Sequence, residues 1–254
     1  MTTQAQTMRK EVHLSGPELT GMVQLRPQDI GKYAIVPGPK ERLDNLVTKL
    51  ENPVKNFTFM EYSMYTGNFM GIRLTAINGG RFAADTAITT ELLCSARAQH
   101  MIRIGSCGAL REDIKIGDLV VVEGAIRGEG VTPYYVDKDF KTRADTKLGQ
   151  SLLDVAKNSG HTVHTGLVWS TDAILRETRE HVGRAVEQGA IAVDMVSSVF
   201  LTICQLYKIP AVVILAVSDN VITGEMGFMD PMYYMAEGSI IKTALELVKK
   251  LEGK

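Results

Sequence analysis

The sequence predicts a single α/β domain with a β-sheet that helices cover on both faces. Short β-rich runs recur along the 254 residues, and stretches that are typical of helices separate several of them. Strands that alternate with helices form a sheet whose two faces are both buried. No internal repeat or low-complexity linker interrupts the pattern. Residues 1–254 are therefore predicted to form one domain.

The elements can be assigned from the periodicity and from the turn residues between them. The predicted strands are Tyr33–Val36, Ile72–Ile77, Met101–Ile104, Asp118–Val122, His164–Val168, Ala190–Asp194 and Ala211–Val217. The predicted helices are Thr86–His100, Lys147–Ser159, Ser197–Tyr207 and Gly238–Leu251. The apolar stretch FTFMEYSMYTGNFM fits either the core or an interface between subunits.

The composition excludes several classes of protein. The chain is 45% hydrophobic and 22% charged, which is enough apolar material for a large core. The formal net charge is -1 with mixed signs along the chain, so no binding of nucleic acid is expected. No run reaches the roughly 18 apolar residues that span a bilayer, and the first residues lack an apolar signal core, so no membrane partner is expected.

The cysteines indicate a reducing compartment. Cys94, Cys107 and Cys204 have no CxxC spacing, which argues against a zinc knuckle, and their odd number argues against a secreted disulfide framework. The chain also has no HExxH motif and no histidine cluster for a metal. A cytoplasmic protein without a metal site is therefore expected.

Two segments share one design. IVPGPKERLDNLV and IRIGSCGALRED each contain an apolar run, then glycine, with an arginine nearby. A glycine after a strand is often only a turn residue. In open α/β sheets, however, such turns lie at the carboxyl ends of strands, where backbone N–H groups can receive an anion. The two segments together predict an anion site, with a glycine turn at residues 105–108.

The same segments resemble a known family. PGPKER, IRIGSCGAL and LAVSDNVITGE are similar to conserved segments of the nucleoside phosphorylase and nucleosidase superfamily, in its purine nucleoside and uridine phosphorylase branch. EVHLSG, HTGLVWSTDAIL and IAVDMVSSVFL extend the likeness over nearly the whole chain. The resemblance implies a phosphorylase/hydrolase-like three-layer α/β/α sandwich around a central mixed β-sheet. It also implies a homo-oligomer, either a dimer or a trimer of dimers.

The resemblance implies that the enzyme cleaves the N-glycosidic bond of a purine nucleoside with inorganic phosphate as co-substrate and with no cofactor. Gly38, Arg42, Arg103 and Ser106 would hold the phosphate. A guanidinium fork can grip this anion while one oxygen stays free to attack the anomeric carbon. The remaining implied contacts are His13, Asp194 and Met195 for the ribose, and Cys107, Gly108 and Ile174 for the base. His13 would serve a neighbouring subunit.

Asp219 is the predicted catalytic residue. Cleavage of the glycosidic bond leaves negative charge on the departing purine, and a carboxylic acid at N7 can protonate it or donate a hydrogen bond. The Ser218-Asp219 pair favours a purine over uridine as substrate, because the uridine-specific branch carries a different segment here.

Several positions depart from the family pattern. Met60 stands where relatives carry an arginine that is lent across the dimer interface to the phosphate. Val196 replaces a glutamate that accepts hydrogen bonds from the ribose, and the shorter Asp194 replaces another. Ile174 keeps the apolar area of a base-stacking ring without the ring itself. No counterpart is found for the arginine that assists the catalytic aspartate in the bacterial hexameric purine enzymes.

Other positions leave two interpretations open. Arg81 or Lys40 could replace the charge that is missing at Met60 or could meet a phosphate on the substrate, and either could instead be solvated. Ser197 and Ser198 could contact the sugar or begin a helix, since serine is a favoured cap. The functional alternatives are a nucleosidase of the same fold, in which water replaces phosphate, and a nucleoside-binding homologue with weakened catalysis.

Overall fold

A computed structural model describes residues 12–254. The helices are α1 (Gly16–Met22), α2 (Lys40–Val47), α3 (Ala83–Ser95), α4 (Thr146–Ala156), α5 (Arg179–Glu187), α6 (Ser197–Leu206) and α7 (Pro231–Leu251). The strands are β1 (Tyr33–Pro37), β2 (Glu51–Phe59), β3 (Tyr62–Phe69), β4 (Ile72–Ile77), β5 (His100–Ala109), β6 (Leu119–Gly128), β7 (Thr142–Arg143), β8 (Val163–Thr171), β9 (Ala190–Asp194), β10 (Ala211–Asn220) and β11 (Glu225–Met226).

The strands of the described chain form one mixed sheet. Its order is β11-β10-β6-β8-β9-β5-β1-β4-β3-β2, with β7 paired to β6. β5 lies parallel to β1 and β10 and antiparallel to β9. Because β10 also pairs with β6, and β6 leads through β8 to β9, these five strands close into a ring. The ring brings the ends of β5, β9 and β10 side by side.

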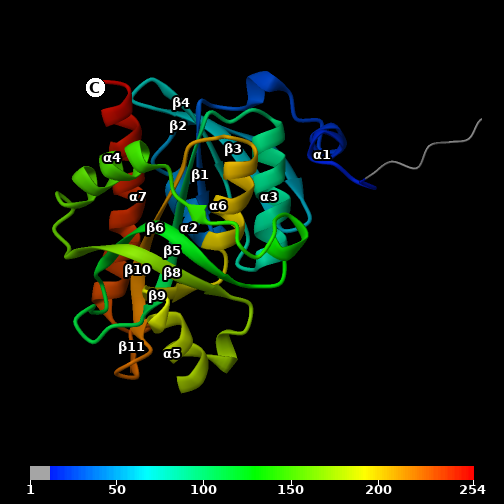
Figure 1. Cartoon of the computed structure of the whole chain (residues 1–254). Helices are drawn as coiled ribbons and strands as arrows, with labels where there is room; N and C mark the ends of the chain where they lie inside the picture. Colours follow the sequence, from blue (N-terminus) through cyan, green and yellow to red (C-terminus); the bar gives the residue numbers. More distant parts are fainter. Residues whose placement is uncertain (1–11) are drawn as a thin grey trace, which may run out of the picture.

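Alternate residues of the central strands enter two separate cores. In β5, Met101 belongs to one hydrophobic cluster and Ile102 to the other, and Val213 and Ile214 divide in the same way in β10. The first cluster includes residues of α3 and α6, and the second includes residues of α4 and α7. Figure 1 shows these helix pairs on opposite sides of the strands. The predicted α/β/α sandwich with a central mixed sheet is confirmed.

The predicted turn at residues 105–108 is wrong. These residues continue β5, whose ladder with β10 runs from Met101 to Ala109. The glycines serve close packing here: a Cβ at Gly105 would lie 2.7 Å from Cδ2 of Leu215. Because the ladder with β10 keeps the segment extended, this part of the predicted anion site depends on side chains rather than on a loop of backbone N–H groups.

Helix boundaries were also mispredicted. α3 ends at Ser95, and His100 already belongs to β5. Arg97 adopts a left-handed conformation (φ 67°) between the two elements. α7 begins at Pro231 instead of Gly238, because the carboxylate of Asp230 caps it by accepting from the N–H of Met232 at 2.8 Å. The β2–β3 hairpin was not predicted; β3 is mostly buried and β2 is mostly exposed.

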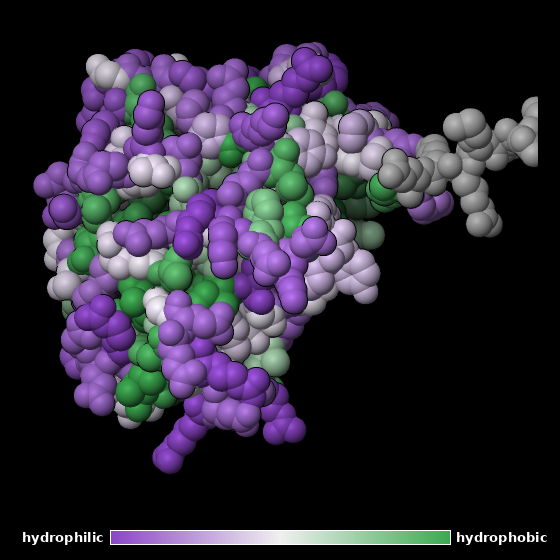
Figure 2. Space-filling model, viewed as in Figure 1, coloured by the Kyte–Doolittle hydropathy of each residue, from purple (hydrophilic) through white to green (hydrophobic). Residues whose placement is uncertain are grey.

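Hydrophilic side chains cover most of the face shown in Figure 2, with hydrophobic side chains in small patches between them. Within residues 12–254, none of the helices combines the length and the apolar composition that a bilayer-spanning segment needs.

Candidate active site

A cavity of about 490 Å³ opens where the carboxyl ends of β1, β5, β9 and β10 meet. Ligands of α/β sheets bind at such strand ends. The lining residues come from distant parts of the sequence: Gly38, Pro39, Arg42, Arg81, Phe82, Arg103, Ser106, Gly108, Ile174, Glu177, Val193, Asp194, Met195, Ser218, Asp219, Phe228, Tyr233 and Glu237. Somewhat larger surface hollows lie elsewhere. This cavity is the candidate site because cationic and acidic groups converge in it.

Two arginines meet at one end of the cavity. Arg42 lies in the first turn of α2 and Arg103 in β5, and each side chain is only 5% exposed. They approach a common point, because a Cβ at Gly38 would lie 3.9 Å from Nη1 of Arg42 and 3.9 Å from Nη2 of Arg103. Ser106 and the N-terminus of α2 border the same region. This end of the cavity therefore has the charge and the donors for an anion.

Arg103 carries unused hydrogen-bonding capacity. Its Nε and Nη1 atoms are buried and find no hydrogen-bond partner within residues 12–254. Burial lowers the pKa of Arg103 to about 10, while the charge of Asp194 opposes this fall and the charge of Arg42 adds to it. The guanidinium is thus still charged at neutral pH. Burying a charged donor without a hydrogen-bond partner costs free energy, unless a ligand supplies the acceptor.

Arg42, by contrast, already has an anionic partner. Its Nη2 donates to the carboxylate of Glu237, which projects from α7. The hydroxyl of Tyr233, one turn earlier in α7, donates to the same carboxylate at 2.9 Å. The Nε of Arg42 has no hydrogen-bond partner in the described part of the chain. Glu237 therefore fixes Arg42 and cancels part of the positive charge at the anion end.

Asp219 lies at the other side of the site, on a β-bulge. The ladder of β10 with β5 shifts register between Val217 and Asp219, so Ser218 is the extra residue. Asp219 then pairs with Gly108. A Cβ at Gly108 would lie 2.8 Å from Oδ2 of Asp219, so glycine leaves the space that this carboxylate occupies. The hydroxyl of Ser218 donates to Oδ1 of Asp219 at 2.7 Å.

Two carboxyl groups of the cavity, those of Asp219 and Glu177, hold protons more tightly than usual. Burial raises the pKa of Asp219, and the hydrogen bond from Ser218 partly opposes the rise. Burial also raises the pKa of Glu177 to about 7, with a further contribution from the negative charge of Asp219. A carboxyl group whose pKa is raised in this way keeps its proton to a higher pH than usual and can act as an acid.

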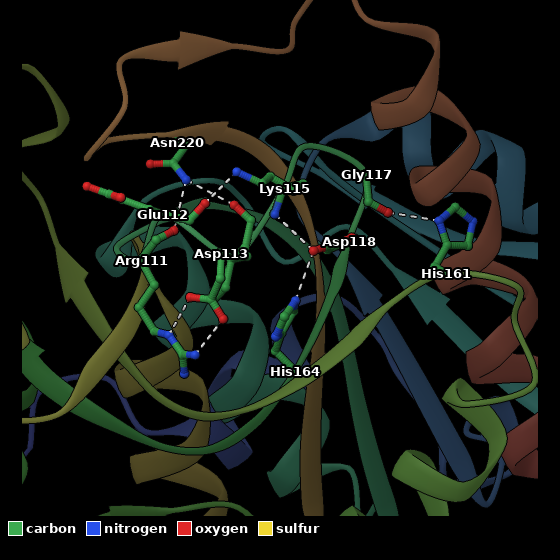
Figure 3. Close-up of polar contacts among 10 residues, drawn as sticks. Arg111, Glu112, Asp113, Lys115, Gly117, Asp118, His161, His164 and Asn220 are labelled. Carbon is green, nitrogen blue, oxygen red and sulfur yellow. Dashed lines mark hydrogen bonds and ion pairs between the residues drawn. The ribbon is translucent and has the colours of Figure 1, made fainter.

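The strand end that carries Asp219 is anchored by the next residue. Asn220 is 1% exposed, and its Nδ2 donates to the carbonyls of Arg111 and Ile114, each at 2.9 Å. Figure 3 shows Asn220 reaching the loop that follows β5. The same loop is closed further along, where Oδ2 of Asp118 accepts from the N–H of Lys115 at 2.9 Å. These contacts attach the strand end that carries Asp219 to the loop after β5.

Asp194 is placed in the site, but protein groups already bind its carboxylate. Oδ1 accepts from the hydroxyl of Ser170 at 2.7 Å, and Oδ2 accepts from the hydroxyl of Ser197 at 2.6 Å. Oδ2 also accepts from the N–H of Ser197 at 3.0 Å, which caps α6. Ser197 and Ser198 are the first two residues of this helix and neither lines the cavity, but neither caps it: Val196 holds the N-cap position, and the two serine hydroxyls donate to Asp194 and Glu129. The predicted ribose role of Asp194 stays a prediction.

The predicted residues thus divide into two groups. The structure brings Gly38, Arg42, Arg103, Ser106, Gly108, Ile174, Asp194, Met195 and Asp219 together around one cavity. It leaves out Cys107 and His13: Cys107 is 3% exposed and packs in the hydrophobic core, and His13 is exposed. Burial also raises the pKa of the Cys107 thiol, which does not favour a nucleophile. The roles assigned to all of these residues stay predictions.

The structure also shows where the positions that depart from the family pattern lie. Met60 is 72% exposed at the tip of the β2–β3 hairpin, and Val196 is fully buried. Arg81 is exposed and lines the cavity. Lys40 does not line it and forms an ion pair with Asp44 at 2.6 Å. Of the two basic residues, Arg81 is therefore the one that a ligand in the cavity could meet.

Sequence reasoning gave no site role to several residues of the cavity wall, among them Glu177, Phe228, Tyr233 and Glu237. Tyr233 and Glu237 are four residues apart and lie on one face of α7. The sequence spacing would have indicated this shared face if the predicted helix had begun at Pro231. Glu177 sits in the charged stretch LRETRE, which is typical of a solvated surface. Phe228 gave no signal in the sequence.

Comparisons with known proteins find nucleoside phosphorylases among the relatives of this chain. A uridine phosphorylase of Thermococcus kodakarensis is 27% identical over 219 residues, which cover 81% of this chain and 79% of that protein. A DeoD-type purine nucleoside phosphorylase of Colwellia psychrerythraea is 29% identical over 209 residues, covering 81% and 89%. The crystal structure of a Vibrio fischeri uridine phosphorylase matches with a TM-score of 0.82 at 25% identity and covers 90% of this chain and 95% of that chain. The model of the phosphorylase superfamily matches residues 32–240. The chain belongs to the phosphorylase superfamily.

Proposed function

We propose that the chain is a nucleoside phosphorylase that cleaves purine ribonucleosides or deoxyribonucleosides to the free base and the sugar 1-phosphate. One observation carries the proposal. Arg103 is a buried, charged guanidinium with unpaired donors, and it lines the same cavity as Asp219, a carboxyl group whose pKa is raised by burial. An anion binder and an acid in one cavity are what phosphorolysis of a glycosidic bond requires.

The residues suggest a division of labour. Arg103, Ser106 and the N-terminus of α2 would hold inorganic phosphate and aim one oxygen at the anomeric carbon. As the glycosidic bond breaks, Asp219 would pass its proton to N7 of the purine, so that a neutral base leaves. Phosphate is a substrate in this scheme, and the reaction uses no metal and no cofactor.

A purine is proposed as the base because of Asp219. Uridine phosphorylases and purine nucleoside phosphorylases are both among the relatives, so the comparisons support either base. A purine has a basic N7 at which a carboxylic acid can assist departure, whereas uracil has no such nitrogen. The β-bulge, the gap at Gly108 and the raised pKa of Asp219 all support an acid at this place.

Hydrolysis is the second candidate. The carboxylate of Glu237 forms an ion pair with Arg42, and Met60 supplies no positive charge. A site with less positive charge binds phosphate dianion more weakly, which favours water as the nucleophile. A nucleoside-binding homologue without turnover is the remaining alternative.

Base release is the test. Adenosine, inosine, their 2'-deoxy forms and uridine would each be incubated with and without inorganic phosphate, and the free base would be measured by chromatography. Base release that requires phosphate supports the proposal. Base release that is equal with and without phosphate would show that the chain is a hydrolase. Asp219→Asn is expected to lower kcat on the order of 10²- to 10⁴-fold. Asp139→Asn, at an exposed loop position, serves as the matched control. No release from any nucleoside, with binding retained, would identify a binding homologue.

We also propose that the chain acts in the cytoplasm as a homo-oligomer. His13 and the β2–β3 hairpin tip at Met60 are both exposed, which is compatible with contacts to a neighbouring subunit. Light scattering of the purified protein measures the oligomeric state directly.

A further inference from the structure

Arg81 lines the cavity and has no role in the scheme above. It lies in the turn between β4 and α3 and is exposed, and among residues 12–254 it has neither a hydrogen-bond partner nor an ion-pair partner. Its Cζ atom lies 5.9 Å from the ring centroid of Phe82, which also lines the cavity. A guanidinium over an aromatic ring keeps its N–H donors free for a ligand.

The turn that carries Arg81 packs against the glycine turn after β1. The N–H of Gly79 donates to the carbonyl of Pro37 at 2.7 Å. A Cβ at Gly38 would lie 3.5 Å from the carbonyl oxygen of Gly80, so the two turns are in contact at the residue directly before Arg81. Gly80 adopts a left-handed conformation (φ 73°), which glycine tolerates best. These contacts hold the backbone of Arg81 beside Gly38.

Gly38 also marks the anion end of the cavity. A Cβ placed there would lie 3.9 Å from Nη1 of Arg42 and 3.9 Å from Nη2 of Arg103. The two buried guanidinium groups and the backbone next to Arg81 therefore share one glycine as their common neighbour. Three arginines thus line this region of the cavity, and they come from α2, from β5 and from the β4–α3 turn.

The acidic residue closest to Arg81 in the sequence does not neutralise it. Asp85, in the first turn of α3, accepts a hydrogen bond from the hydroxyl of Tyr62 at 2.6 Å. Asp85 does not line the cavity and forms no ion pair with Arg81. The positive charge of Arg81 is therefore available at the cavity wall, where solvent screens it until a ligand covers it.

We propose that Arg81 binds a phosphate group together with Arg103. This inference rests on the proposed function, which places phosphate at this end of the cavity. Arg42 shares its charge with Glu237, so Arg81 and Arg103 are the two arginines of the cavity without an ion pair in the described part of the chain. Guanidinium groups bind phosphate oxygens by charge-assisted hydrogen bonds. Arg103 is buried and Arg81 is exposed, so they hold the anion from the interior and from the solvent side.

Arg81→Gln tests this assignment, because it removes the charge and the guanidinium donors. With the purine nucleoside that the wild type cleaves fastest, we expect the KM for inorganic phosphate to rise about 10-fold. Arg81→Lys keeps the charge and loses the forked donor geometry, so its KM should lie between those of the wild type and Arg81→Gln. Arg97→Gln removes an exposed arginine just beyond the other end of α3 and should leave the KM unchanged.

A second arm separates two sources of the phosphate group. Inorganic phosphate and the 5'-phosphate of a nucleotide present the same oxygens to a guanidinium. Release of adenine from adenosine 5'-monophosphate is therefore measured beside release from adenosine. If Arg81 binds the nucleotide, Arg81→Gln raises the KM for the monophosphate about 10-fold and leaves the KM for inorganic phosphate unchanged. A rise in either KM supports the inference. If neither KM changes, the inference is refuted, and the proposed function stands as long as base release requires phosphate.

The outcomes also separate this inference from the proposed function. If uridine alone is cleaved, the purine assignment fails, and the KM for inorganic phosphate is compared with uridine as the substrate. If no nucleoside or nucleotide is cleaved, the proposed function fails, and calorimetric binding of inorganic phosphate and of adenosine 5'-monophosphate decides about Arg81. Weaker binding to Arg81→Gln than to the wild type supports its role. Equal binding to the two proteins, or no binding to the wild type, refutes it.

Discussion

Replacing Glu177 by glutamine should stabilise the protein at alkaline pH and have no effect in acid. The pKa of this carboxyl rises from 4.5 to about 7 on folding. The folded protein therefore binds the proton more tightly than the unfolded chain does. The contribution of Glu177 to stability is intact below pH 4.5 and is lost as the pH rises to about 7. Glutamine resembles the neutral acid at every pH, so it avoids this loss.

The size of the effect follows from the same values. A shift of this size corresponds to about 3 kcal/mol when the group is fully ionised. Because Glu177 is only half-buried, solvent screening reduces the expected gain to about 2 kcal/mol. Urea unfolding of the wild type and of Glu177→Gln at pH 4 and at pH 8 measures it.

The difference in the free energy of unfolding between the two proteins should be near zero at pH 4 and about 2 kcal/mol in favour of the variant at pH 8. Glu187→Gln should show no such dependence on pH, because its side chain is exposed. An equal difference at both pH values, or a less stable Glu177→Gln at pH 8, would refute the burial and the charge repulsion assigned to Glu177.

Three other variants test the rest of the site. Glu237→Gln keeps an acceptor for Arg42 and removes a negative charge, so the KM for phosphate should fall roughly threefold to tenfold; an unchanged or higher KM in steady-state assays would contradict this. Asn220→Ala leaves buried carbonyls unpaired and should lower the free energy of unfolding by about 2 kcal/mol, measured by urea titration, and wild-type stability would show that the anchor is dispensable. Gly108→Ala displaces the carboxylate of Asp219 and crowds Val221 and Val193, so kcat should fall at least about tenfold and the melting temperature should also fall; unaltered kcat would mean that the gap at Gly108 has no catalytic purpose.

The sequence predicted the layers and much of the cavity because both depend on local pattern. Strand ends gather at one edge of a sheet, so motifs that follow strands, such as those of Arg42 and Asp219, are brought together by the topology. The Gly-Ser-Cys-Gly segment was misread because glycine indicates both a turn and a close approach. Pairing with β9 and β10 decides between the two, and that pairing is not visible in one strand.

Glu177 and Glu237 could not be predicted for a different reason. Charged residues usually lie on the surface, and the neighbours of Glu177 in the sequence are charged or polar. Only tertiary packing decides that Glu237 meets Arg42 and that Glu177 lies near Asp219. The structure therefore adds two acidic groups to the site, Glu177 and Glu237, which the family likeness did not indicate.

These acidic groups bear on the choice between phosphorolysis and hydrolysis. Nε and Nη1 of the charged Arg103 have no hydrogen-bond partner within residues 12–254, so a ligand anion at that point is favoured. Arg42 is held by Glu237, and an incoming dianion must either share that guanidinium or displace the carboxylate. A monoanion meets less repulsion from Glu237, because the Coulomb energy scales with the charge. If the enzyme is a phosphorylase, its KM for phosphate should therefore rise as phosphate becomes doubly ionised above neutral pH, and Glu237→Gln should remove most of that rise. A KM that falls over the same range in the wild type would show that the two arginines dominate, and that Glu237 only positions Arg42.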